Sequence, residues 1–183
     1  MKFSTISLLL CSGAAILSAA DAPTIAQIYD RNLAGVEGEL VPLAEAMPVD
    51  LYNFAPTAGE FKDVRTFRQQ VKHIAAVNYM IAAALLEQKP PLDLGAGENG
   101  PDSVTSKQQT VGFLKDSFAY LHKALASINE KNQTDQVKNP FGEGTVSRLG
   151  IATVALTHPM NHYGQMVEYL RMNGIVPPAS RGQ

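Results

Sequence analysis

Two histidines near the C-terminus, His158 and His162, are separated by the three residues Pro-Met-Asn. In an α-helix, residues four apart lie on one face, about one turn from each other. Two imidazoles placed in this way can bind one metal ion, and the chain has only four histidines. The pair therefore predicts a metal site, and His73, in another helix-like segment, is the natural third ligand.

The residues around the pair predict that both imidazoles face the interior. The other positions of the same helical stripe are apolar: Ile151, Ala155, Met166 and Tyr169. A buried imidazole needs a partner for each ring nitrogen, and a metal ion supplies one of the two. The alternative is a pair of core-edge histidines bonded to backbone or tyrosine groups. Pro159 complicates both interpretations, because it removes a helical hydrogen bond and is expected to kink the helix.

Three histidines and a water molecule form a catalytic zinc arrangement that leaves one position open. Imidazole also binds nickel, iron and copper, so the ligand type leaves the metal undecided, with zinc or nickel expected. The remaining histidine, His122, is expected to be solvated or to neighbour a ligand rather than to bind the metal. Asn78 is expected either to line the site or to be a buried structural residue. No general base accompanies the histidines in the sequence.

Helical periodicity predicts an all-α protein, because apolar residues recur at steps of three and four. A capping box at Thr66 and Gln69 marks one helix start, and Thr145 is expected to cap another. Pro42 is expected to kink or shorten the first helix. Four amphipathic helices of this length indicate a four-helix bundle, and no strand pattern of useful length is found. The predicted helices are residues 24–46, 66–89, 106–132 and 145–173.

The first twenty residues, 1–20, carry the pattern of a secretory signal peptide. Lys2 supplies a positive start, residues 6–17 form an apolar run, and residues 18–20 are a small-residue cleavage site. The run is short for a transmembrane helix. This pattern predicts an exported protein, periplasmic or secreted, whose single domain spans residues 21–183 and has no membrane span after cleavage.

The composition excludes several classes of site. Cys11 is the only cysteine and lies in the predicted signal peptide. The mature protein would therefore lack disulfides, thiolate ligands and a cysteine nucleophile. A formal net charge of −2 gives no indication of nucleic-acid binding.

Three segments together resemble the DinB-like (DinB/YfiT) superfamily of metal-binding four-helix bundles. LYNFAP at residues 51–56 is similar to the segment before the family's second helix. TFRQQVKHIA at residues 66–75 is similar to that helix, which carries the first metal histidine. HPMNHYGQMVEYLRMNGIVPP at residues 158–178 is similar to the closing segment and is the most specific of the three. This chain has Tyr163 where the family commonly has arginine, and Pro159 is unusual within the motif.

The resemblance implies a metal triad at His73, His158 and His162, completed by water, in an up-down-down-up bundle that often forms homodimers. Characterised relatives include transferases and isomerases that use low-molecular-weight thiols, which are cytosolic and fit an exported protein poorly. Two functions therefore stay open. One is a metal-dependent hydrolase or thiol-dependent transferase. The other is a non-catalytic module that binds a metal or a small ligand.

Overall fold

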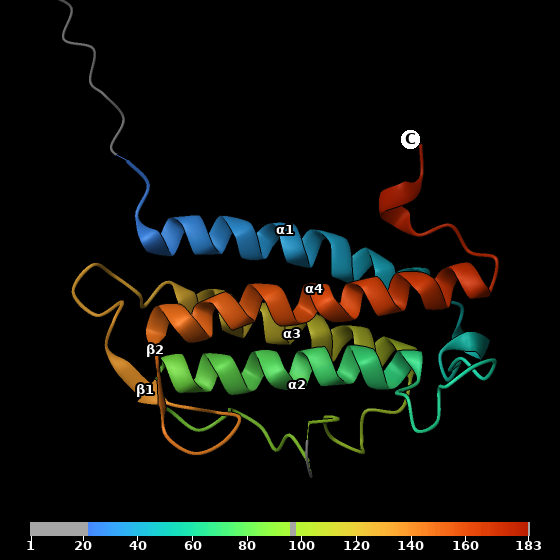
Figure 1. The fold of residues 1–183 in the computed structure, drawn as a ribbon, viewed down its shortest axis with the longest axis horizontal. Helices are drawn as coiled ribbons and strands as arrows, with labels where there is room; N and C mark the ends of the chain where they lie inside the picture. The colour runs from blue at the N-terminus through green and yellow to red at the C-terminus, as the bar shows by residue number, and fades with distance from the viewer. Residues whose placement is uncertain (1–21, 96–97, 183) are drawn as a thin grey trace, which may run out of the picture.

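The computed structural model of the chain describes residues 22–95 and 98–182. The predicted signal peptide, residues 1–20, lies outside the described residues. Four long helices pack side by side, and a short β-hairpin lies at one end of the bundle (Figure 1). This arrangement confirms the predicted all-α four-helix bundle. The helices are α1 (Ile25–Ala46), α2 (Phe67–Leu85), α3 (Lys107–Leu125) and α4 (Arg148–Met172).

Hydrogen bonds between helices fix their relative directions. Tyr29 of α1 shares a hydrogen bond of 3.0 Å with Thr153 of α4, so the early turns of these helices lie at one end. Arg148 at the start of α4 donates to the carbonyl of Leu85 at the end of α2. Lys107 at the start of α3 donates to the carbonyl of Met47, just after α1. Helices α1 and α4 therefore run in one direction and α2 and α3 in the other (Figure 1).

Side-chain caps set the helix starts. The predicted capping box at Thr66 is present, and Thr24 and Ser106 form equivalent boxes for α1 and α3. Helix α1 continues through Pro42 to Ala46, so the proline does not end it early. Helix α4 is capped by Ser147 rather than by Thr145. The predicted cap was wrong because Thr145 is the first residue of a strand.

The β-hairpin is the main departure from the prediction of helices alone. Strands β1 (Gln136–Lys138) and β2 (Thr145–Ser147) pair antiparallel, with Val137 opposite Val146. Each strand has three residues, which is too short for a side-chain alternation to stand out in the sequence.

Helix α3 ends at Leu125, earlier than the predicted residue 132. Side chains after Leu125 take over backbone groups that a continued helix would have used. Asn132 donates to the Ser127 carbonyl at 2.9 Å and accepts from the Asn129 amide at 2.8 Å. Such local bonds compete with the helix, and they turn the chain toward β1.

Helix α2 is the most buried of the four helices. It packs against α3 and α4, and 15 of its 19 residues are buried, which requires partners for its polar side chains. The connection from α2 to α3 covers another side of it. Gly100 lies against α2 with a φ of +71°, and a Cβ there would stand 3.3 Å from the Lys72 carbonyl. Within the described ranges, no helix is long and apolar enough to span a membrane.

Candidate metal centre

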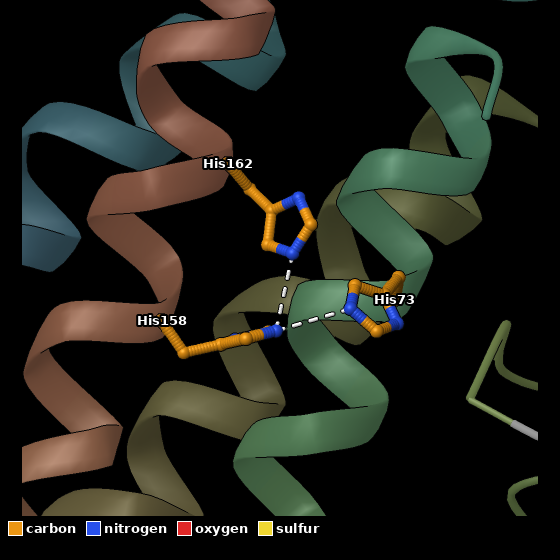
Figure 2. Close-up of side chains that lie close together, drawn as sticks. All are labelled: His73, His158 and His162. Atoms are coloured by element: carbon orange, nitrogen blue, oxygen red, sulfur yellow. Dashed lines mark hydrogen bonds between the residues drawn. The ribbon is translucent and has the colours of Figure 1, made fainter. Parts of the chain in front are cut away.

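The antiparallel packing of α2 and α4 brings three histidines together (Figure 2). The Nε2 atom of His158 lies 3.0 Å from Nε2 of His73 and 3.1 Å from Nε2 of His162. One ring nitrogen of each residue falls within 4.8 Å of the others, so the group can hold a metal ion. His73 and His162 are buried and His158 is half-buried.

The i, i+4 spacing on α4 places two of these rings one turn apart, as expected for a continuous helix. Helix α4 runs unbroken from Arg148 to Met172 through Pro159. The Pro159 ring is itself buried, on the same side of the helix as Ala155 and His162. The proline therefore does not prevent His158 from meeting the other two histidines.

The hydrogen bond of His73 defines its protonation. Its Nδ1 lies 2.7 Å from the backbone carbonyl of Glu98, in the connection between α2 and α3. A carbonyl only accepts, so Nδ1 carries the proton and donates. In the neutral ring, Nε2 then presents a lone pair toward His158.

A chain of side-chain amides fixes the Nδ1 proton of His162. Its Nδ1 donates to Oε1 of Gln70 at 2.7 Å, and Nε2 of Gln70 donates to Oε1 of Gln165 at 2.9 Å. Gln165 continues the chain with a longer contact of 3.4 Å to Asn161. The two-glutamine chain keeps the Gln70 oxygen facing the ring, so Nε2 of His162 also presents a lone pair.

His158 cannot satisfy both neighbours by hydrogen bonding. With its proton on Nε2 it donates to only one of them, and with its proton on Nδ1 it donates to neither. Its Nδ1 is buried without a hydrogen-bond partner among the described residues. Buried polar atoms are normally paired, so this arrangement is incomplete as a hydrogen-bond network. A divalent cation would resolve the contact of the three Nε2 atoms, because it can accept all three lone pairs at once, and it would leave the Nδ1 proton of His158 without a partner among the described residues.

The spacing and charge state of the rings also fit a metal. Two nitrogens bound tetrahedrally to zinc at about 2.0–2.1 Å stand about 3.3 Å apart, close to the observed separations. Burial lowers the pKa of His73, lowers that of His158 to about 4 and lowers that of His162 to about 3. The neighbouring imidazoles and Arg65 contribute to the low pKa values of His158 and His162. The rings are therefore neutral near pH 7, which is the form that binds metals.

The other sequence candidates lie elsewhere. Asn78 donates to Ser117 across the contact between α2 and α3, which supports its structural interpretation. His122 lies between α3 and α1, where its ring nitrogens contact Asp30 and Glu37. His122 is therefore not part of the three-histidine group.

Sequence reasoning missed the polar groups that orient the ligands. Gln70 could have been predicted to lie near the site, because it precedes His73 by three residues and so shares its helix face. Gln165 lies in the closing segment that resembles the family, but the sequence does not indicate that it bonds to Gln70. The Glu98 carbonyl had no signal, because a main-chain oxygen in a glycine-rich connection carries no side-chain pattern.

Comparisons with known proteins agree with this geometry. The DinB superfamily model matches residues 32–166, a range that contains all three histidines. A conserved protein from Enterococcus faecalis of known structure has a TM-score of 0.65 and 19% identity, covering 82% of this chain and 98% of that one. A DinB-like protein from Bacillus subtilis has a TM-score of 0.61 and 16% identity, covering 80% and 92%. None of the curated proteins matches. At these identities the structural likeness shows the fold.

Proposed function

Because the chain belongs to the DinB superfamily, we propose that it binds one divalent metal ion through His73, His158 and His162 and uses it in catalysis. The observation that carries the proposal is the convergence of three Nε2 atoms, in which His158 can donate to only one of its two neighbours. Zinc and nickel are the expected metals, since both bind imidazole well.

A metal in such a site acts as a Lewis acid, which polarises a substrate and lowers the pKa of a water or thiol that it binds. The protein's part is to hold three neutral imidazoles in place. The Glu98 carbonyl and Gln70 fix the Nδ1 protons of His73 and His162, and such outer partners orient ligands and raise their basicity. Three ligands leave a coordination position for substrate.

We favour a hydrolase or a thiol-dependent transferase. These reactions need a nucleophile that the metal itself activates, and no described residue is placed as a separate general base. The Glu98 carboxylate lies 3.9 Å from Nδ1 of His73, on the side of the ring away from the converging Nε2 atoms. Burial raises the pKa of Tyr163 and of Tyr169, which keeps both phenols protonated near pH 7 and so unavailable as bases.

The lack of a separate general base among the described residues also favours a second candidate, a non-catalytic module that binds a metal or a small ligand. A protein that only holds a metal has no need of a base beside the ligands. We also propose that the protein is exported, from the signal-peptide pattern of residues 1–20, and that it forms a homodimer, from the family resemblance. N-terminal sequencing of the secreted form, expected to begin at Asp21, and light scattering test these two points.

Metal content and activity test the main proposal. Purified protein reconstituted with zinc or nickel should retain about one metal per chain after desalting, by analogy with three-histidine sites. X-ray absorption should then show nitrogen ligands only, apart from solvent. Reconstituted protein that retains no metal would overturn the site. A panel of ester, amide and thiol-transfer substrates, compared before and after chelation, separates the enzyme from the non-catalytic module.

A further inference from the structure

A polar cavity of about 340 Å³ lies beside the candidate metal centre. Two of its lining residues connect it to the histidines. Gln70 bonds to the ring of His162, and Asn99 adjoins Glu98, whose carbonyl bonds to His73. The cavity is lined mainly by polar side chains, namely Asp63, Arg65, Gln69, Gln70, Asn99 and Gln165.

Arg65 is held firmly in this cavity but leaves most of its donors unused. Its Nε donates to Oδ1 of Asn99 at 2.9 Å. Its backbone carbonyl accepts a hydrogen bond of 2.9 Å from the hydroxyl of buried Tyr169, which packs edge-on against Phe54. The two terminal nitrogens of the guanidinium have no hydrogen-bond partner, and no carboxylate pairs with Arg65, among the described residues. A guanidinium has five N–H donors, so four remain available in this half-buried side chain.

The charge balance of the region favours an anion. Three neutral imidazoles do not compensate the charge of a divalent metal, and the Glu98 carboxylate, 3.9 Å from Nδ1 of His73, lies on the far side of that ring. Arg65 adds a positive charge near enough to lower the pKa of all three histidines, although it is not the largest influence on any of them. Arg65 also directly precedes Thr66, the N-cap of the 19-residue helix α2, where the helix dipole is positive. The Asp63 carboxylate lines the same cavity but belongs to an exposed residue and makes no ion pair with Arg65 in the described structure.

We propose that this cavity binds the anionic group of a small substrate, a carboxylate or a phosphate, and that the guanidinium of Arg65 is its main hydrogen-bond donor. The inference rests on the proposed metal-dependent function and names the substrate class of that centre. A planar guanidinium matches the two oxygens of a carboxylate or phosphate, and the glutamine and asparagine amides supply further donors. The cavity volume is at the small end for ligand sites, which suits a compact anion rather than a polymer.

Calorimetric titration of succinate and of inorganic phosphate into the zinc-loaded and zinc-free protein tests the proposal. Both anions should bind, and uncharged succinamide should not. Arg65→Gln should weaken binding about 10-fold or more, because it removes a charge-assisted pair. Arg65→Lys should weaken anion binding about 3-fold, because lysine keeps the charge but cannot bind two oxygens in the bidentate geometry of a guanidinium. Asp63→Asn should tighten it about 2-fold by removing a repelling carboxylate.

Arg181→Gln is the matched control, because Arg181 is exposed near the C-terminus and the substitution should leave anion binding unchanged. Circular dichroism checks that each variant folds, and Asp63→Asn gives a test in which binding improves. Anion binding that is absent in the parent protein, or equal in the parent and Arg65→Gln, overturns the inference.

Elemental analysis of the same samples separates this inference from the metal proposal. Protein that holds zinc but binds anions independently of Arg65 would retain the metal site and overturn the anion site. Protein that holds no metal but binds succinate through Arg65 would overturn the metal function and retain the anion site.

Discussion

Two histidine clusters in this bundle have opposite surroundings. In the triad of His73, His158 and His162, the outer nitrogens of two rings donate to neutral oxygens and the inner nitrogens converge. At His122, the two ring nitrogens face the carboxylates of Asp30 and Glu37, at 2.5 and 3.2 Å on opposite sides of the ring.

The difference shows which surroundings suit a histidine to bind a metal. Both ring nitrogens of His122 already face a carboxylate oxygen, so neither nitrogen is directed toward a position that it could share with another histidine. Two neutral acceptors on the outer side leave neutral rings whose remaining lone pairs meet. The triad is also largely removed from water, whereas the Asp30 side chain is 53% exposed, so solvent screens the second cluster.

The largest effect is expected when one histidine is removed from each cluster. His73→Ala or His162→Ala should lower zinc affinity about 1,000-fold or more, because the loss of one of three ligands costs several kcal/mol of binding energy. His122→Ala should retain the metal. Competition with a chelator measures both affinities. Equal losses in all three variants would show that the triad is not the site.

A smaller effect is expected from the groups that orient the triad. Gln70→Ala should reduce metal affinity by about 10- to 100-fold, because His162 loses the acceptor of its Nδ1 proton. Gln108→Ala, an exposed substitution near the start of α3, is the control. Affinity that stays at the parental value would mean that packing alone orients the His162 ring.

The triad should also make the metal-free protein sensitive to acid. Burial lowers the pKa of His158 to about 4 and of His162 to about 3, below the value of about 6.5 in the unfolded chain. The unfolded state therefore binds more protons below about pH 6.5, so the free energy of unfolding should fall as pH drops from there toward 4. Each ring contributes at most about 1.4 kcal/mol per pH unit.

Urea unfolding of the chelated protein at pH 7, 6 and 5 measures this slope. His162→Asn should flatten it by removing one of the three rings whose pKa is lowered. A stability that is constant over this range in the chelated parent protein would contradict the prediction.

The smallest effect is expected at the second cluster. His122→Asn should lower the free energy of unfolding by about 0.5–1 kcal/mol, because the contacts of His122 with Asp30 and Glu37 join α3 to α1 and are partly exposed. The loss should shrink in about 1 M salt, which screens such pairs. Unfolding of parent and variant at low and high salt tests this, with Lys123→Gln on the exposed side of α3 as the control. A loss that does not depend on salt would point to packing instead.

Local sequence patterns were sufficient for much of this molecule. Apolar periodicity and the capping box at Thr66 predicted the helices, because both are set by residues within one or two turns. The spacing of His158 and His162 placed both rings on one helix face for the same reason. The end of α3 at Leu125 was missed, since the hydrogen bonds among Ser127, Asn129 and Asn132 outweigh a weak continuing periodicity.

The sequence by itself determined which side chains can bind a metal and which helix faces carry them, because helical spacing is a local property. Only the tertiary structure decided that His73 meets the α4 pair, since 85 residues separate His73 from His158. It also decided that neutral acceptors surround the triad while carboxylates surround His122. Those partners come from other segments of the chain, and the packing of the helices sets which atoms face one another.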